Sequence, residues 1–218
     1  MSHTFAITVG APLLILLYII KSDRFPEPLP CVLKIFFIGV ILVFPAGYLN
    51  GIFIHGSEYD LSFLAGLTEE GLKFLAFLFF VSKKFQFNER MDAIVYGVLI
   101  SLGFATYENL EYVYGGILEA DPFYIAFIRA LTAIPMHAMC GVIMGYHFGI
   151  RFFDHKADHL WKAFLIPMLV HGTHNFLTQA WPLMFLFLIA VFFYIKNLHN
   201  QFMVYQIGKE KEGENKLL

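Results

Sequence analysis

Long apolar stretches separated by short polar joints make up most of the chain, from residue 4 to residue 198. A helix needs about 17 to 25 mainly apolar residues to cross the hydrocarbon core of a bilayer. The pattern therefore predicts an all-α, polytopic bundle of about seven transmembrane helices. The expected spans are residues 4–20, 31–54, 61–82, 91–114, 122–150, 160–179 and 182–198.

Proline and glycine mark several joints between these spans, as expected for residues that favour turns and interrupt helices. They are Pro26, Pro28 and Pro30, then Gly115 and Gly116, then Pro182. Pro135 lies inside the fifth span, where it is expected to kink the helix and free a backbone carbonyl. We expect one integral-membrane domain over residues 1–200 and a polar cytoplasmic tail over residues 201–218.

The composition narrows the class of protein further. The chain is 58% apolar and only 15% charged, whereas soluble domains average about 45–50% apolar and about 25% charged. This excludes a disordered chain, an ordinary soluble domain and a nucleic-acid-binding protein with a basic face, so lipids are the expected surroundings. Cys31 and Cys140 form no spaced framework for a disulfide scaffold or a structural zinc site.

The placement of basic residues predicts the orientation. Thirteen of the 15 Lys and Arg residues flank the first, third and fifth joints or lie in the C-terminal tail. The other joints contain no Lys or Arg, and the second and fourth joints contain the acidic residues Glu58, Asp60, Glu119 and Asp121. Basic residues are retained on the cytoplasmic side, so we expect the N-terminus outside and the C-terminus in the cytoplasm. The first span has no basic residue before it and is interpreted as a retained helix, not a cleaved signal.

Two basic residues, Lys73 and Arg129, lie inside predicted spans together with acids and histidines. The companions are Glu69, Glu70, Glu108, Glu111, His137, His147, His171 and His174. A charge at the centre of a bilayer costs at least about 2.5–3.5 kcal/mol, so such groups face the bundle interior and pair with one another. At about 1.5 Å per residue, four spans bring these groups to the outer half of the bilayer, with His137 deepest.

Local spacing suggests roles for some of these groups. Lys73 follows Glu70 by three residues and Glu69 by four, so both carboxylates share a helical face with it and one is a candidate general base. His171 and Asn175 are four apart, so Asn175 is expected to orient the imidazole or to donate to an oxyanion.

Other polar residues have structural interpretations. We expect Arg129 to pair with an acid near the outer surface, with Glu111 as the candidate. His147 and His174 are expected to be structural or interfacial.

Two hydrolytic mechanisms fit this set of residues. In the first, Glu108, His137 and His171 hold a divalent metal ion, with zinc favoured, and Glu69 or Glu70 activates its water. In the second, Glu and His activate water without a metal, assisted by Asn175 at the oxyanion. HExxH, GxGD and GxSG motifs are all absent. Spacing alone leaves a proton-coupled transporter open, because proton relays use the same residue types.

Four ordered motifs on four predicted spans resemble the PrsW family over nearly the whole chain. They are Glu69-Glu70-x-x-Lys73, Phe104-Ala-Thr-Tyr-Glu108-Asn109, His137-Ala-Met-x-Gly141 and His171-x-x-x-Asn175, supported by Asp92-Ala-Ile-Val-Tyr-Gly97. Each motif is weak alone, but the four in order are specific.

The resemblance implies an intramembrane protease of the bacterial cell membrane. Its implied reaction is site-1 cleavage of a membrane-anchored anti-sigma factor on the extracytoplasmic side, which activates a stress sigma factor. It also implies that the catalytic motifs include the acids Glu69, Glu70 and Glu108 and the histidines His137 and His171.

Two relatives of this family define the remaining alternatives. CAAX-type prenyl endopeptidases carry His at the position of Glu108, so the acid disfavours prenyl-protein cleavage. Aph-1 proteins suggest a non-catalytic membrane scaffold, in which the polar cluster would only hold helices together.

Overall fold

The computed structural model describes residues 2–54, 62–83 and 86–215, with side chains described as far as residue 210. Its regular elements are all helical, which confirms the predicted all-α class. They are α1 (Ser2–Ser22), α2 (Leu29–Phe53), α3 (Leu64–Ala76), the π-helical turn η2 (Phe77–Val81), α4 (Arg90–Tyr114), α5 (Pro122–Leu131), α6 (Ala133–Phe153), α7 (His159–Leu177) and α8 (Trp181–Asn215).

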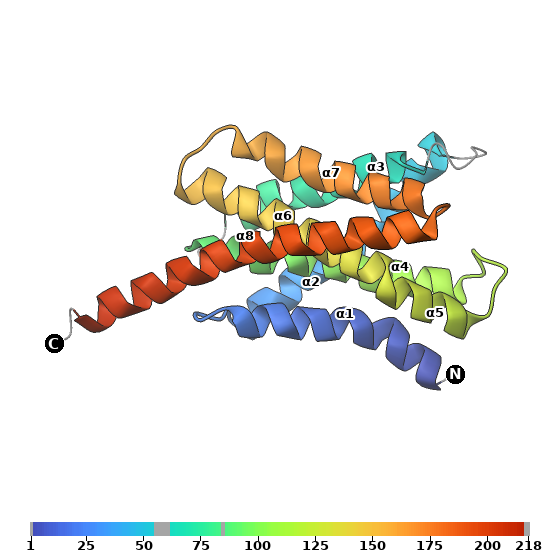
Figure 1. The fold of residues 1–218 in the computed structure, drawn as a ribbon, viewed down its shortest axis with the longest axis horizontal. Coiled ribbons are helices and arrows are strands. Elements are labelled where there is room, and N and C mark those ends of the chain that lie inside the picture. Colours follow the sequence, from blue (N-terminus) through green and yellow to red (C-terminus); the bar gives the residue numbers. More distant parts are fainter. Residues whose placement is uncertain (1, 55–61, 84–85, 216–218) are drawn as a thin grey trace.

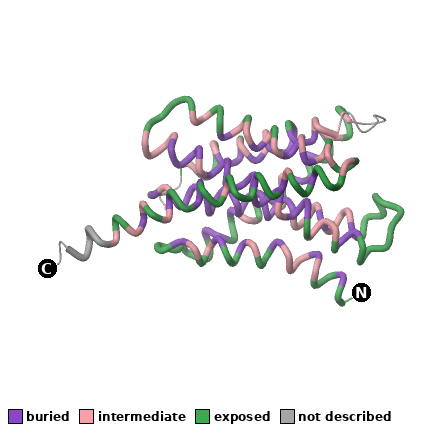
Figure 2. Tube along the Cα trace, viewed as in Figure 1, coloured by how far each residue is buried: buried purple, intermediate pink, exposed green. Residues whose placement is uncertain are grey.

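The helices lie roughly along one axis and alternate in direction (Figure 1). In the view of Figure 1, α3 and α7 lie on one side of α4 and α6, and α1 and α2 lie on the other. Figure 2 shows buried residues concentrated in the middle of the bundle. The apolar window of α4 is 83% buried, against 28% for α1 and 22% for α8, so α4 is the central helix and α1 and α8 are peripheral.

Five segments are long and apolar enough to cross a membrane, which supports the predicted membrane class. They are Ser2–Ser22, Leu29–Phe53, Arg90–Tyr114, Pro122–Phe153 and Trp181–Glu210. The predicted spans 61–82 and 160–179 are also helical over most of their length, in α3 with η2 and in α7; residue 61 lies outside the described residues. The third span is a 13-residue α-helix continued by η2, and α7 interrupts its apolar run with His171, His174 and Asn175.

The predicted fifth span, 122–150, is divided into two helices. The break falls at Thr132, whose φ and ψ are −125° and −76°, three residues before the proline expected to cause it. Pro135 instead occupies the first turn of α6, where its missing N–H removes no intrahelical hydrogen bond. The break lets α5 pack against α1 and α4 as a separate short helix.

Close backbone approach explains how α4 and α6 form the centre of the bundle. A Cβ atom at Gly141 would lie 2.8 Å from the carbonyl oxygen of Gly97, and one at Gly145 would lie 2.2 Å from that of Ala93. Small residues are the usual means of close helix packing in membranes. Gly141 is one turn from His137, so this contact also brings the predicted site residue close to α4.

The last helix continues well beyond the expected end of the seventh span at residue 198. α8 extends to Asn215 and projects past the rest of the bundle (Figure 1). Phe202 and Gln206 are buried, so the first part of the predicted polar tail packs on the protein. Exposed apolar side chains such as Leu14, Tyr48 and Phe193 cover the outer helices, as suits contact with lipid.

Candidate functional site

Four helices bring the predicted acids, histidines and lysine into one interior group, here called the Glu/His cluster. It consists of Glu69, Glu70 and Lys73 from α3, Glu108 from α4, His137 from α6 and His171 from α7. All are buried except Glu108, whose side chain exposes 14% of its surface. The predicted convergence of four spans is therefore observed.

Lys73 links two parts of the cluster. Its Nζ donates to Glu70 Oε1 over 2.7 Å and to His137 Nδ1 over 3.1 Å, and it lies 4.2 Å from the centre of the Phe104 ring. Because an ammonium group only donates, Nδ1 of His137 must accept. The proton of the neutral ring is then on Nε2, which donates to Glu108 Oε2 over 3.1 Å.

His171 has the opposite tautomer. Its Nδ1 lies 2.9 Å from Glu70 Oε1, and the carboxylate paired with Lys73 can only accept, so Nδ1 donates. In the neutral form of the ring the lone pair is on Nε2, which lies 3.7 Å from Glu69 Oε2. A carboxylate that accepts from the second ring nitrogen is the usual support for a metal-binding or basic imidazole. Glu70 thus fixes the orientation of His171.

Glu69 has one occupied and one free oxygen. Its Oε1 accepts from Asn50 Nδ2 over 3.1 Å, while Oε2 is buried and has no hydrogen-bond partner among the described residues. The side-chain Oδ1 of Asn50 in turn accepts from the Thr68 hydroxyl. A buried carboxylate oxygen without a partner is costly, so it is positioned for a ligand or a reacting group.

Asn50 is a site residue that the sequence interpretation missed. It lies in the last part of α2, and the only signal was an amide within an otherwise apolar predicted span. Its contact with Glu69 crosses from α2 to α3, and no spacing rule predicts a contact between those two positions.

Arg129 forms the more open side of the site. Its Nη2 donates to Glu108 Oε2 over 2.6 Å and its Nε donates to Asn109 Oδ1 over 2.8 Å. Asn109 also donates to the backbone carbonyl of Thr8 over 2.8 Å. The expected partner Glu111 forms no ion pair within the described part of the chain, so the partner of Arg129 is Glu108.

Asn175 does not bond to His171 in this arrangement. Its Oδ1 lies 3.2 Å from His174 Nδ1, and its Nδ2 donates to the backbone carbonyl of Ser62 over 3.3 Å. Both residues belong to the last turns of α7, next to the segment that leads into α3. His147 lies elsewhere on α6 and contacts His159, as expected for a structural histidine.

The donor atoms of Glu69 and His171 can bind a metal ion as they stand, whereas His137 would first have to lose a proton. Glu69, His137 and His171 each offer a donor atom, and these atoms lie within 4.8 Å of one another. The free Glu69 Oε2 and the His171 Nε2 lone pair suit zinc, which accepts nitrogen and oxygen ligands. His137 Nε2 carries a proton toward Glu108 in the arrangement described, and metal binding there would release it. The structure thus groups Glu69 with the two histidines, and ligation by Glu108 remains a prediction.

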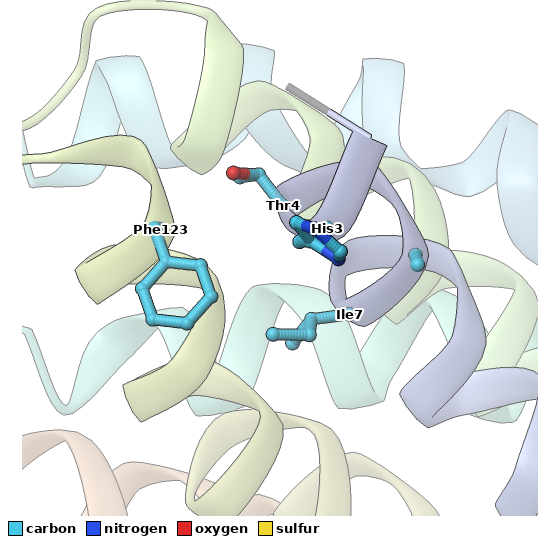
Figure 3. A pocket seen from close by; sticks show the side chains of 5 residues that line it. His3, Thr4, Ile7 and Phe123 are labelled. Atoms are coloured by element: carbon cyan, nitrogen blue, oxygen red, sulfur yellow. The ribbon is translucent and has the colours of Figure 1, made fainter.

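An open cavity of about 620 Å³ lies between the start of α1 and the start of α5 (Figure 3). Its lining residues are His3, Thr4, Ala6, Ile7 and Phe123. None of them belongs to the Glu/His cluster. The cavity is therefore a feature of the α1–α5 surface and is not the enclosed site itself.

Comparison with known proteins gives one consistent result. Residues 27–197 match the family model described as PrsW family intramembrane metalloprotease. The chain is similar to the protein named Protease PrsW from Bacillus subtilis (strain 168), with 38% identity over 175 residues, covering 76% of this chain and 78% of that protein.

Similar matches come from other bacteria. Protease PrsW from Geobacillus kaustophilus is 38% identical over 178 residues, covering 78% of this chain and 76% of that protein. Protease PrsW from Clostridioides difficile is 31% identical over 204 residues, covering 86% and 85%. No solved structure matches the chain.

Proposed function

The chain belongs to the PrsW family of intramembrane metalloproteases, and we propose that its Glu/His cluster cleaves a single-pass membrane protein near the extracytoplasmic surface. The chain is a peptidase of the bacterial cell membrane. The proposed substrate is a membrane-anchored anti-sigma factor, whose site-1 cleavage would activate a stress sigma factor.

The proposed topology has seven crossings with the N-terminus outside. The start of α1 and the end of α8 lie at opposite ends of the bundle (Figure 1), which supports an odd number of crossings. In this topology α5 and α6 together form one crossing. Two further crossings, in addition to the five apolar segments, are supplied by α3 continued by η2 and by α7. Residues 1–200 then form one membrane domain, with the polar tail 201–218 in the cytoplasm.

The depth of the cluster supports cleavage on the outer side in this topology. Glu108 lies six residues before the end of α4 at Tyr114, and His171 lies six before the end of α7 at Leu177. Six residues correspond to about 9 Å along a helix. Both ends face outside in the proposed topology, so the substrate would be cut near its outer juxtamembrane segment.

In the proposed mechanism Glu70 and Lys73 are positioning residues. Lys73 compensates the charge of Glu70, and Glu70 holds the Nδ1–H of His171 over 2.9 Å. The Nε2 of His171 is thereby kept on the side of Glu69. This preorganisation means that the imidazole need not reorient when the substrate binds.

Glu69 is the proposed general base. Its Oε2 accepts no hydrogen bond from the described residues and can take a proton from an attacking water, while Asn50 holds Oε1 in place. Asn175 is the proposed oxyanion donor, because its Nδ2 donates to the backbone carbonyl of Ser62 over 3.3 Å and this long bond can be exchanged for one to the substrate.

The proposed metal is zinc. The residues that would hold it are His137 and His171, with Glu69 or Glu108 as the carboxylate ligand. When bound, such an ion polarises the scissile carbonyl and lowers the pKa of a bound water. The role of this chain's own residues is to present the donors and to exclude bulk water.

The observation that carries the proposal is the free Glu69 Oε2 at 3.7 Å from His171 Nε2 in a buried, polar interior. The test is co-expression of an epitope-tagged single-pass anti-sigma factor with the wild type or with Glu69→Gln. We expect the cleaved fragment with the wild type and its loss with Glu69→Gln. Glu111→Gln is the matched control, because that acid lies one turn from Glu108 and forms no described ion pair.

Equal cleavage by wild type and Glu69→Gln would contradict the proposal. The non-catalytic Aph-1-like scaffold would instead give no fragment with any variant, together with loss of the folded protein in Glu70→Gln and His171→Ala. Monitoring protein level by membrane fractionation in the same samples separates these outcomes.

A further inference from the structure

A second buried group of carboxylates lies far from the Glu/His cluster. Asp23, at the end of α1, meets Glu89 and Asp92 at the start of α4, and we call these three the acidic cluster. Each offers a carboxylate oxygen, and these oxygens lie within 4.8 Å of one another. Asp92 precedes Glu108 by 16 residues of α4, or about 24 Å, so this group is separate from the proposed catalytic site.

Two oxygens of the acidic cluster have no hydrogen-bond partner. Asp92 Oδ2 accepts from two backbone N–H groups at the start of α4, each over 2.8 Å. Asp23 Oδ1 accepts from Gln206 Nε2 over 2.8 Å, and the same amide donates to Glu89. Asp92 Oδ1 and Asp23 Oδ2 accept no hydrogen bond from an N–H or O–H group of the described residues, and Asp92 exposes only 1% of its surface and Asp23 only 7%. A fourth carboxyl group, that of Glu27, lies against Asp92.

The neighbouring cations do not neutralise these carboxylates. Arg24 pairs with Glu210, and Arg90 pairs with Asp154. Burial raises the pKa of Glu89, and the charge of the Lys209 ammonium, which lies over the Tyr205 ring, lowers that pKa only in part and without forming an ion pair with Glu89. No Lys or Arg among the described side chains forms an ion pair with the acidic cluster. Several buried carboxylates in mutual contact without a counter-charge repel one another strongly.

We propose that the acidic cluster binds a hard divalent cation, Mg²⁺ or Ca²⁺, through Asp23, Glu89 and Asp92. Carboxylate oxygens alone are the ligands that these two ions prefer, whereas zinc prefers nitrogen and sulfur ligands as well. The unpartnered Asp92 Oδ1 and Asp23 Oδ2 supply open coordination positions. The cation also supplies the positive charge that the surrounding side chains lack.

The cation would join three segments that are distant in sequence. Asp23 belongs to the α1–α2 joint, Glu89 and Asp92 begin α4, and Gln206 attaches α8 to both through its amide. Ion binding therefore stabilises the packing of the projecting half of α8 against the bundle. In the proposed topology this end of the bundle faces the cytoplasm.

The test is thermal unfolding of the purified full-length chain in detergent after chelation, with MgCl₂ or CaCl₂ titrated back in separate arms. Because a ligand that binds only the folded state stabilises it, we expect a saturable rise in Tm of about 5 °C. The arm with the lower half-saturating concentration identifies the preferred ion. Asp92→Asn and Asp23→Asn are expected to abolish the rise. Asp158→Asn, which alters an exposed carboxylate paired with Lys162, is the matched control and keeps it.

Two further measurements test whether a cation binds at the acidic cluster. Without cation, Asp92→Asn is expected to unfold at a higher temperature than the wild type, because it removes one repelling charge. A His171→Ala background is expected to retain the Mg²⁺ or Ca²⁺ response, because that site is separate. A Tm unaffected by either ion, or a wild-type response in Asp92→Asn, would overturn the proposal in favour of carboxyl groups that share protons.

Discussion

The ammonium of Lys73 donates to Glu70 Oε1 over 2.7 Å, and neither side chain exposes any surface. Such a pair is costly to bury, and its attraction only offsets the desolvation when the remaining hydrogen bonds are made. Lys73 makes its second bond to His137, and Glu70 accepts its second from His171. Both bonds to Glu70 use Oε1, and its Oε2 has no hydrogen-bond partner among the described residues. The ion pair therefore couples the positions of both histidines.

Replacement of Lys73 by Met is expected to destabilise the fold by about 3–5 kcal/mol, because it leaves the carboxylate of Glu70 buried and unpaired. The double variant Lys73→Met/Glu70→Gln should recover part of this loss, since it removes the charge as well. Thermal unfolding in detergent measures both. Lys162→Met, at an exposed pair, is the control, and an equal loss there would contradict the expectation.

Asn50→Ala is expected to lower the rate of substrate cleavage by about 10- to 100-fold while the protein remains folded. Asn50 holds one oxygen of the proposed base Glu69, and a small displacement of a catalytic group is enough to cause such a loss. The measurement is the initial cleavage rate in detergent or proteoliposomes. Tyr48→Phe, at an exposed position of the same helix, should cleave at the wild-type rate. A wild-type rate for Asn50→Ala would mean that Glu69 needs no support from α2.

Chelation of the purified active protein is expected to abolish cleavage, and zinc but not Mg²⁺ should restore it. The donors assembled around His171 include nitrogen as well as oxygen, which favours zinc over hard cations. Metal analysis should find about one zinc per chain in the wild type and none in His171→Ala.

His147→Ala is the matched control for the metal analysis, because that histidine contacts His159 away from the Glu/His cluster. It is expected to retain zinc. Cleavage that survives complete removal of metal would instead assign the reaction to the Glu/His mechanism without a metal.

Gly145→Val is expected to prevent stable folding. A Cβ atom at this position would lie 2.2 Å from the carbonyl oxygen of Ala93, so α4 and α6 would have to separate. Gly208→Val on the projecting part of α8 is the control, because a Cβ atom there has no neighbour within 4 Å. Expression level and gel-filtration profile in detergent should separate the two variants, and similar profiles would contradict the packing argument.

Much of this protein was predictable from the sequence because hydrocarbon penalises every exposed polar group. The helical class, most helix positions and the membrane environment follow from the apolar runs. The same penalty made Glu69, Glu70 and Lys73 conspicuous inside those runs, and the ordered motifs indicated the family that the comparisons then showed.

The pairings within the site came only from the tertiary structure. Partner choice depends on the rotation of each helix about its axis and on its contacts with neighbours, which residue spacing does not encode. Arg129 therefore pairs with Glu108 and not Glu111, and Asn50 reaches Glu69.

The position of the helix break and the composition of the acidic cluster also depend on tertiary packing. Packing of α5 on α1 and α4 accompanies the break at Thr132, ahead of the proline that the sequence suggested. Asp23, Asp92 and Gln206 meet across most of the chain length. The sequence by itself determined that Glu69, Glu70 and Lys73 had to be buried, because they lie inside apolar runs and burial of charge there is a local cost. The burial of Asp23, Glu89 and Gln206, and the choice of partners throughout, is a property of the whole packed bundle.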